Sequence, residues 1–444
     1  MQLHIEGTLT TQDNHRHISH NFVVPEGATK IEIDFEYAPK RTEKYGNLLT
    51  LSLFDPQTER GTGHRGQPKQ HIMVSTAEAS PGYLLGSLPA GTWDIMINSN
   101  LINDGPPVNY QFDIAIGFET QSEPKTWTSG TTLPRGEGWY RGDLHGHTIH
   151  SDGSWDVEGL VGFARQHQLD FVTLTDHNTI SALPQMDSLS ADGLLTMGGF
   201  ELTTFYGHAL ALGIRQILDW RVRPNERTIA QIKGEIEALG GLFVIAHPMA
   251  PGDPICTGCQ WDYDDMMPGT AGVVEVWNEH WDSTSNNEES LQLWYGWLNQ
   301  GHRLYATVGT DIHGTPDPTL EFGFNNLFAE ALSEVAILKA IRQGHNYLSS
   351  GPKLAFSSTS TVGKTVMMGD HLDGQEKLVT VSWEACNADD RVRLIVDRQV
   401  KEELVAETKG EHSWKVDEAH WCLVEVRDLK GNLRAVTNPI FIEQ

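Results

Sequence analysis

The sequence predicts a multidomain chain in which a central α/β domain is flanked by an N-terminal and a C-terminal β-sandwich domain. Two patterns predict this: period-two strand patterns at both ends, and apolar strands that alternate with helices in the middle. The length of 444 residues also exceeds that of an ordinary single domain. No run of apolar residues is long enough to span a membrane.

The first 120 residues follow the two-residue period that is typical of half-buried strands. The segment KIEIDFEY (30–37) alternates apolar and polar residues, and LTLSLFD, TWDIMIN and YQFDIAIG repeat the pattern between Pro, Gly and Asn clusters. We therefore expect an antiparallel sandwich or jelly roll over residues 1–120 and a polar linker over residues 121–138. Such a domain either binds a ligand such as a sugar or serves as a structural accessory.

From residue 139 onward, apolar strands alternate with amphipathic helices. Helices are expected over residues 156–168, 228–241, 289–302 and 333–344, and strands over residues 170–177, 242–247, 273–278 and 304–313. Continuously apolar strands separated by helices are typical of a parallel sheet covered by helices, either open or closed into a barrel. We expect this domain to cover residues 139–350.

The strand pattern returns in the last part of the chain. The segments LVTVSWEA, RVRLIVD, WCLVEVRD and NPIFIEQ predict a second small sandwich over residues 351–444.

The charge balance narrows the possible partners. The chain carries 59 Asp and Glu against 32 Lys and Arg, a net charge of −27. Such a surface disfavours nucleic acid and anionic membranes as partners. No basic and apolar leader opens the sequence, so a cytoplasmic location is expected, whereas the oligomeric state is not predicted. The central domain's basic cluster is either a solvated surface or a phosphate-recognising patch; it consists of Arg215, Arg221, Arg223 and Arg227.

Histidines and carboxylates recur where the strands of the central domain are expected to end. Ten of the 20 histidines lie between His145 and His313. Strand ends of an α/β barrel converge on one face, and His145-x-His147, like Asp311-x-His313, would direct both side chains to one side of a strand. Imidazole with carboxylate suits Zn, Mn or Fe, and a bridging carboxylate lets two or three ions lie close together. The candidate ligands are His145, His147, Asp152, His177, Glu201, His208, His247, Asp311 and His313.

These motifs resemble those of a known family. DLHGHTIHSDG, TLTDHNT, GFELT, IAHP and GTDIH are similar to the four motifs and the bridging glutamate of the PHP (polymerase and histidinol phosphatase) superfamily of metal-dependent hydrolases. The resemblance covers residues 140 to about 350. It implies a distorted (β/α)7 barrel with a trinuclear site that holds Zn, Mn or Fe.

The resemblance also implies a role for each ligand. It assigns His145, His147 and Asp311 to the first ion, Glu201 as a bridge to a second ion completed by His208 and His247, and Asp152, His177 and His313 to the third. Many family members carry a histidine in place of Asp152. Either Asp152 or His177 is expected to protonate the leaving oxygen. Asp176 is expected to orient a ligating imidazole, while Glu275 and Asn278 either face the site or serve loop hydrogen bonds. Residues that bind the substrate are not predicted.

A narrower resemblance concerns the flanking segments. SSGPKL, EVWN and the stretch Cys256–Trp261 resemble the carbaryl-hydrolase-like branch, whose namesakes cleave carbamates and related esters. The pair Cys256 and Cys259 can be interpreted as half of a zinc knuckle. Because no second pair follows at zinc spacing, a loop staple or two buried thiols is the favoured interpretation.

The sequence therefore predicts an enzyme that uses two or three divalent transition-metal ions to activate water for hydrolysis of a small phosphoester. The second candidate substrate is a carboxyl ester or a carbamate. For such a neutral ester, candidate apolar walls are Trp155, Phe205, Tyr206, Trp261 and Trp277. Two hypotheses from different functional classes are an exonuclease, which the acidic charge disfavours, and an inert glycan-binding protein, which the intact ligand set disfavours.

Overall fold

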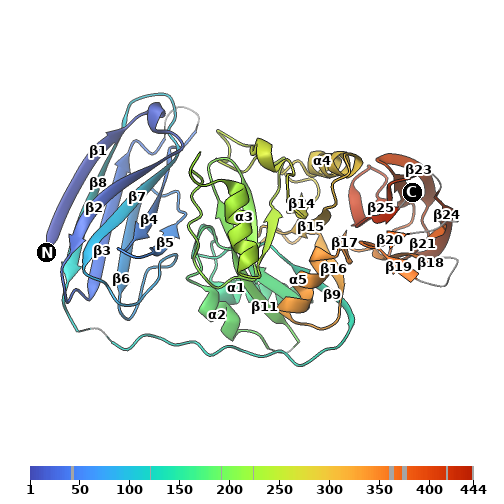
Figure 1. Ribbon diagram of the computed structural model, residues 1–444, viewed down its shortest axis with the longest axis horizontal. Coiled ribbons are helices and arrows are strands. Elements are labelled where there is room, and N and C mark those ends of the chain that lie inside the picture. Colours follow the sequence, from blue (N-terminus) through green and yellow to red (C-terminus); the bar gives the residue numbers. More distant parts are fainter. Residues whose placement is uncertain are drawn as a thin grey trace.

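The computed structural model describes residues 1–41, 45–120, 122–191, 193–223, 225–359, 365–372, 378–416 and 419–442. The protein is multidomain and mostly β, with few helices and several sheets. Strand-rich regions formed by the two ends of the chain lie on either side of a mixed middle region (Figure 1). Within the described residues, no helix has both the length and the apolar character needed to cross a membrane.

The N-terminal region consists of two four-stranded antiparallel sheets. Their strand orders are β1-β8-β3-β6 and β2-β7-β4-β5. The alternation expected over residues 30–37 is present in β3, whose buried side chains join those of the other sheet in one core. The elements are β1 (Gln2–Leu9), η1 (Thr11–Asp13), β2 (Arg16–Val24), β3 (Lys30–Ala38), β4 (Leu48–Phe54), β5 (Glu59–Gly63), β6 (Lys69–Ser75), β7 (Gly91–Leu101) and β8 (Val108–Gly117).

After β8, a long segment runs along the outside of the molecule to the middle region (Figure 1). Its described residues form no helix or strand before β9. Residue 121, the first of the predicted linker, lies outside the described residues.

The middle region contains all four of the expected helices, each within a few residues of its expected bounds, and the short helix α2 in addition. The helices are α1 (Val157–Gln166), α2 (Leu183–Ser188), α3 (Ile229–Ala238), α4 (Asn287–Asn299) and α5 (Glu334–Arg342), with the 3-10 turn η2 (Asp264–Met266). The strands are β9 (Gly138–Asp143), β10 (Phe171–Leu174), β11 (Leu195–Thr203), β12 (His208–Leu212), β13 (Leu242–Ile245), β14 (Val273–Asn278), β15 (Tyr305–Gly309), β16 (Phe324–Ala329) and β17 (Asn346–Ser349).

The central sheet is mixed, so the expectation of a purely parallel sheet is wrong. The order is β15-β14-β13-β12-β11-β10-β9-β16-β17; β9, β10 and β11 run parallel, as do β13, β14 and β15. However, β12 is antiparallel to both of its neighbours, and β16 is antiparallel to β9. The physical reason for β12 is the connection 204–207, which is far too short for a crossover and permits only a hairpin.

No backbone ladder joins β15 to β16 among the described residues, so the sheet is not closed into a barrel by strand pairing. Asparagine side chains bridge this gap instead. Asn325 of β16 accepts a hydrogen bond from Val308 N at 3.2 Å and donates to Val308 O at 2.5 Å. Asn346 and Asn438 similarly bond the backbone of Ala306. We refer to Asn325, Asn346 and Asn438 as the asparagine seam; the expected (β/α)7 barrel stays a prediction.

The C-terminal strands continue the central sheet. β17 pairs with β26, and the order continues as β26-β25-β22-β23 against a second sheet, β19-β18-β21-β24, with a shared core between them. The elements are β18 (Lys353–Thr359), β19 (Thr365–Met367), β20 (His371–Leu372), β21 (Leu378–Glu384), β22 (Arg391–Val396), β23 (Gln399–Val405), β24 (Lys409–Lys415), β25 (Trp421–Arg427), β26 (Leu433–Thr437) and β27 (Ile440–Ile442).

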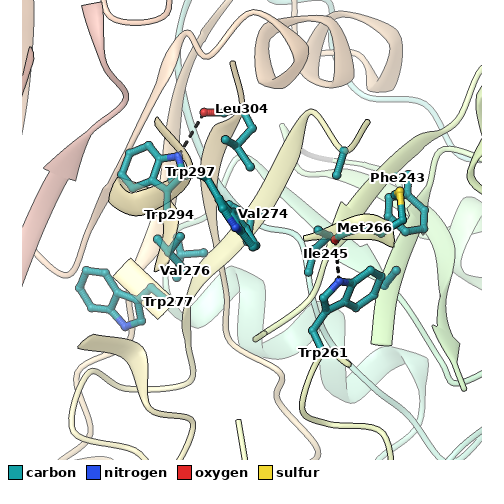
Figure 2. Close-up of a cluster of buried hydrophobic side chains, with 14 of the residues drawn as sticks. Phe243, Ile245, Trp261, Met266, Val274, Val276, Trp277, Trp294, Trp297 and Leu304 are labelled. Atoms are coloured by element: carbon teal, nitrogen blue, oxygen red, sulfur yellow. Dashed lines mark hydrogen bonds between the residues drawn. The ribbon is translucent and has the colours of Figure 1, made fainter. Parts of the chain in front are cut away.

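A tryptophan-rich cluster fixes α4 and the neighbouring loops against β13 and β14. The indole N–H of Trp294 donates to Leu304 O at 3.1 Å, and that of Trp261 donates to Met266 O at 2.8 Å (Figure 2). Trp277 is 0% exposed in the same cluster. Because these buried aromatic side chains pack closely, they hold β14 in place at the edge that carries Glu275 and Asn278.

The asparagine seam can be tested by Asn325→Leu, which keeps the approximate size of a side chain that is 0% exposed. The change leaves the N–H and C=O of Val308 without partners, and each such group costs about 1–3 kcal/mol. We expect the free energy of unfolding of the metal-free protein to fall by about 2–5 kcal/mol in urea denaturation. Asn326→Ala is the control, since that amide bonds only Phe324 O of its own strand. Equal stability of Asn325→Leu and the wild type would contradict the role of the seam.

Candidate metal centre

The motifs His145-x-His147 and Asp311-x-His313 lie beyond the ends of their strands. β9 ends at residue 143 and β15 at residue 309, so the expectation that these pairs are part of the strands is wrong. Two features end the regular strands: the Asp143 carboxylate accepts the backbone N–H of residue 310 at 3.0 Å, and Asp311 has a left-handed φ of 49°. Either feature interrupts a regular ladder.

An isolated parallel bridge nevertheless holds the two motifs side by side. It joins Gly146 to Ile312, the central residue of each motif. His147 N donates to Ile312 O at 2.9 Å, and Asp311 N donates to His145 O at 3.0 Å. The two residues that flank a bridged position point to the same side of the backbone. The bridge therefore brings His145 and His147, which flank Gly146, close to Asp311 and His313, which flank Ile312.

Glu201 of β11 lies at the centre of the cluster and is 1% exposed. Its Oε2 lies 3.2 Å from His145 Nε2 and 3.0 Å from His177 Nδ1. Its Oε1 lies 2.9 Å from His208 Nδ1 and 3.2 Å from His247 Nε2. Burial opposes ionisation of this carboxyl, but the surrounding imidazoles outweigh burial and hold the pKa of Glu201 well below its usual range.

Two further carboxylates complete the cluster. Asp311 Oδ1 lies 2.9 Å from His147 Nε2. At the rim, Asp152 lies 3.4 Å from His177 Nε2 and 3.2 Å from His313 Nε2.

The candidate ligands form three overlapping groups, each of which can hold a metal ion with ligand atoms within 4.8 Å of one another. The groups are His145 with His147, Glu201 and Asp311; His147 with Asp152, His177 and His313; and His177 with Glu201 and His208. The first two contain the ligand sets that the sequence resemblance implies for the first and third ions. The third has His177 where the resemblance implies His247, which contacts Glu201 directly.

Unsatisfied buried atoms show that this set of residues fits a metal ion. The ring Nε2 atoms of His145 and His147, Oε2 of Glu201 and Oδ1 of Asp311 are buried, and none has a hydrogen-bond partner among the described residues. These four residues are the members of the first group. Buried polar atoms without partners are rare in folded proteins, and four at one point are accounted for by a shared cation.

The neighbours of the ligands fix how the imidazoles are oriented. His145 Nδ1 lies 3.0 Å from Glu275 Oε2, so a proton on Nδ1 leaves Nε2 free to face the cluster. Asn278 donates to Glu275 Oε1 at 2.8 Å and to Asp311 Oδ2 at 3.2 Å. Both residues of β14 therefore face the centre.

Asp176 bonds a loop rather than an imidazole. It accepts the N–H and hydroxyl of Thr148 at 2.8 and 2.7 Å and the hydroxyl of Ser151 at 2.6 Å. Ser151 in turn lies 3.5 Å from His147 Nδ1, so Asp176 acts on that ring only through Ser151.

A cavity of about 230 Å³ opens over the cluster. Its apolar side consists of Ala250, Pro251, Ile255 and the Cys256–Cys259 disulfide. The disulfide closes a short loop, which is one of the two arrangements that the favoured interpretation of the cysteine pair allowed. Cys259 O lies 3.2 Å from His247 Nδ1 and orients that ring. Other lining residues are Asn278, Glu279, Thr284 and Ser285.

None of the five aromatic residues expected to wall the cavity lines it. Trp261 and Trp277 are 2% and 0% exposed in the hydrophobic core. Phe205 stacks on His17, and the Trp155 indole donates to His147 O at 2.7 Å. Tyr206 packs edge-on against Tyr263.

The basic cluster also lies away from the cavity. Its arginines bond carboxylates instead: Arg215 pairs with Asp187 and Glu334, Arg221 and Arg223 with Asp219, and Arg227 with Glu235.

Two titratable lining residues, Glu279 and His64, are absent from the sequence-based predictions. Glu279 follows β14 directly with a φ of 59°, and burial together with Asp311 raises its pKa. The strand-end rule that selected its neighbours could have selected it. His64 comes from the N-terminal sandwich, where nothing in the sequence marks it. Burial, with His177 beside it, lowers the pKa of His64 to about 3.

Comparison with known proteins finds no matching family model and no match among curated proteins. The structural neighbours include a two-domain protein from Bacteroides vulgatus described as containing a predicted PHP-like metal-dependent phosphoesterase (16% identity, 72% of this chain and 100% of that chain, TM-score 0.39). A putative metal-dependent phosphoesterase from Bifidobacterium adolescentis has 17% identity, covers 40% of this chain and 89% of its own, and has a TM-score of 0.29. An amidohydrolase from Chromobacterium violaceum has 16% identity, covers 39% and 87%, and has a TM-score of 0.26. These likenesses are distant.

The pKa of His313 predicts how metal binding depends on pH. Burial lowers this pKa, but Asp152 and Asp311 outweigh it and raise the pKa to about 9. Below that pH the ring carries a proton that a metal ion must displace. We expect the Zn²⁺ affinity of the Asp152 group to rise by about tenfold per pH unit between pH 7 and 9 and then to level off, in titrations against a competing chelator. His313→Gln should weaken binding and make this rise shallower, although His177 of the same group, whose pKa is also raised, keeps part of it; a rise of unchanged slope in the variant would contradict the assignment.

Glu201→Gln tests the central carboxylate. The change keeps the size of the side chain but removes the charge that the imidazoles and ions share, so we expect loss of at least about one equivalent of bound metal by elemental analysis. Glu279→Gln is a matched control, because Glu279 lines the same cavity but belongs to none of the three groups. Unchanged metal content in Glu201→Gln, or equal loss in the control, would show that Glu201 is not a ligand.

Proposed function

We propose that this protein is a metal-dependent hydrolase of the PHP superfamily that cleaves a small phosphoester with the help of two or three divalent ions, Zn, Mn or Fe. The observation that carries the proposal is the convergence of six imidazoles and three carboxylates in one cluster below a cavity, where four buried ligand atoms make no hydrogen bond to any described residue. The order of the sequence motifs supports the superfamily. The branch resemblance is not needed for this proposal.

Divalent ions held by these residues supply Lewis acidity and make water available as a nucleophile near neutral pH. The chain's own contribution is to fix the donors. The Nδ1 atom of His145 faces the Glu275 carboxylate and that of His247 faces Cys259 O, so both rings present Nε2 to the centre. Glu201 supplies the negative charge that several imidazoles and ions share.

Either Asp152 or His177 is the proposed proton donor to the leaving oxygen. They lie 3.4 Å apart at the rim, and the Asp152 side chain is 33% exposed, so a leaving alcohol can reach them. His313, on the other side of Asp152, and His177 hold the pKa of Asp152 well below its usual range against the effect of burial, so this carboxylate is ionised. Burial lowers the pKa of His177, but Glu201 and Asp152 outweigh it and raise that pKa, so His177 is the better candidate for the donor.

The charge of the loaded centre favours an anionic substrate. Three divalent ions would bring about six positive charges, and the carboxylates of Asp152, Glu201 and Asp311 would cancel about three of them. A net positive centre attracts a phosphoryl group although the whole chain is acidic, because the distant charges are screened beyond about 8–10 Å. The cavity of about 230 Å³ suits a small molecule better than a polymer.

One observation favours the second candidate, a carboxyl-ester or carbamate hydrolase. Neither Lys nor Arg is among the described residues that line the cavity. Its apolar side, with Pro251 and Ile255, would accommodate a neutral aryl group. A neutral ester would then be bound by shape and polarised by the ions alone.

The two candidates are separated by assaying the protein after loading with Zn²⁺, Mn²⁺ or Fe²⁺. We expect hydrolysis of p-nitrophenyl phosphate or bis(p-nitrophenyl) phosphate, slower cleavage of p-nitrophenyl acetate and an aryl carbamate, and no digestion of single-stranded DNA. Glu201→Gln should lower kcat for every substrate by at least about 100-fold, because the shared charge is lost. Cleavage of the carbamate or acetate with no phosphoester turnover under any metal would establish the second candidate instead.

A further inference from the structure

The N-terminal sandwich reaches the metal centre. His64 follows the last residue of β5 and lines the cavity together with Asp152 and His177. Its ring centroid lies 4.4 Å from that of His177, with the two planes tilted by 36°. One wall of the proposed active site is therefore built by a region that the sequence patterns separate from the catalytic domain.

The sandwich is bonded to the two loops that carry Asp152 and His177. Arg65, next to His64, donates to Ile149 O at 2.9 Å, three residues before Asp152. Gly82 accepts from Thr179 Oγ1 at 2.7 Å, and its N–H donates to Ser181 Oγ at 3.1 Å, both just after His177. These contacts fix the sandwich relative to the same ligands that His64 faces.

Gly82 shows how closely the two regions approach. Its φ is +93°, and a Cβ at this position would lie 2.7 Å from Thr62 O and 2.8 Å from His150 O. Only glycine fits between these two carbonyl oxygens, one on β5 and one on the Asp152 loop. The position of His64 is thus set by backbone packing and not by a flexible side-chain contact.

The imidazole ring of His64 is available as a hydrogen-bond donor. Its ring makes no hydrogen bond or ion pair to any described residue, and it belongs to none of the three candidate metal groups. Two of the other neutral donors of the cavity are already used: Asn278 bonds Glu275, and Ser285 donates to Asn278 Oδ1 at 2.9 Å. A neutral imidazole carries one N–H, which in a cavity whose described lining has no Lys or Arg is a means of binding an anionic oxygen.

We propose that His64 is a substrate-binding residue whose ring N–H donates to an oxygen of the substrate's phosphoryl group on the Asp152–His177 side of the cavity. The sandwich would thereby complete the active site. This inference rests on the proposed function for the class of substrate, but not for the placement of His64.

The test uses the full-length, metal-loaded protein and inorganic phosphate as the probe. For His64→Ala we expect phosphate to bind about tenfold more weakly in calorimetry, since a hydrogen bond to a charged group is lost. KM for p-nitrophenyl phosphate should rise by a similar factor while kcat changes less than about threefold. The bound metal content and thermal midpoint should match those of the wild type. His64→Asn, which keeps a side-chain N–H, should recover part of the affinity.

His71→Ala is the matched control, because His71 belongs to the same sandwich but pairs with Asp34 on an exposed surface. Its phosphate affinity should equal that of the wild type. Equal phosphate affinity in His64→Ala and the wild type would overturn the inference, as would no phosphate binding by the wild type. Loss of metal in His64→Ala would also overturn it, because His64 would then be a metal ligand. If phosphate affinity falls as expected but the wild type hydrolyses no phosphoester, the proposed function fails, whereas the placement of His64 as an anion-binding residue of the cavity stands.

Discussion

The burial of one carboxylate is the constraint on which the rest of the site depends. Glu201 is 1% exposed, and an ionised carboxylate in such a place is unfavourable unless opposite charge or hydrogen-bond donors surround it. The chain meets this requirement with imidazoles from separate segments, of which His145, His177, His208 and His247 contact Glu201 directly. Donors shared in this way leave some buried ring nitrogens without a hydrogen bond to any described residue, and those atoms are what a cation would satisfy. Folding and metal binding are therefore coupled through a single side chain.

The scaffold explains how segments so far apart in sequence meet within a few ångströms. The β11–β12 hairpin places His208 opposite Thr203, two residues from Glu201. The bridge between Gly146 and Ile312 aligns the two short motifs. The side chains of the asparagine seam make hydrogen bonds to the backbone of β15, where a neighbouring strand of a closed sheet would otherwise make them. The seam holds β15 near β16 although the two strands do not pair, so the loop after β15 keeps Asp311 in place without a regular closed sheet.

Short local patterns made the ligands predictable, whereas the surroundings of the site depend on tertiary packing. All nine candidate ligands lie around one cluster, since spacing within motifs and position after strands are local properties. The direction of an aromatic side chain is not local: Trp261 and Trp277 were expected at the cavity but pack into the core. Trp277 lies on β14, and the sequence does not say which face of a strand meets the helices. Trp261 lies in a loop, whose path depends on tertiary packing. His64 could not have been found, as its contact with His177 depends on how two domains dock. Antiparallel β12 could not be recognised from its apolar run, since only the short connection before it distinguishes it from a parallel strand.

Domain docking also bears on how this site would choose its substrate. The central region lines the cavity with carboxylates, imidazoles and an apolar wall that includes Ile255, and the described lining contains no Lys or Arg. Bound ions would attract any anionic or polarisable ester, so they would provide little discrimination by themselves. Selectivity must then come from protein groups around the ions, and the proposed hydrogen bond from His64 to a phosphoryl oxygen is such a contribution from outside the central region. A wall supplied by a separate sandwich can change in sequence without disturbing Glu201 or the ligands around it. The central sheet would then hold the residues that carry out the reaction, and the segment after β5 would contribute to substrate recognition.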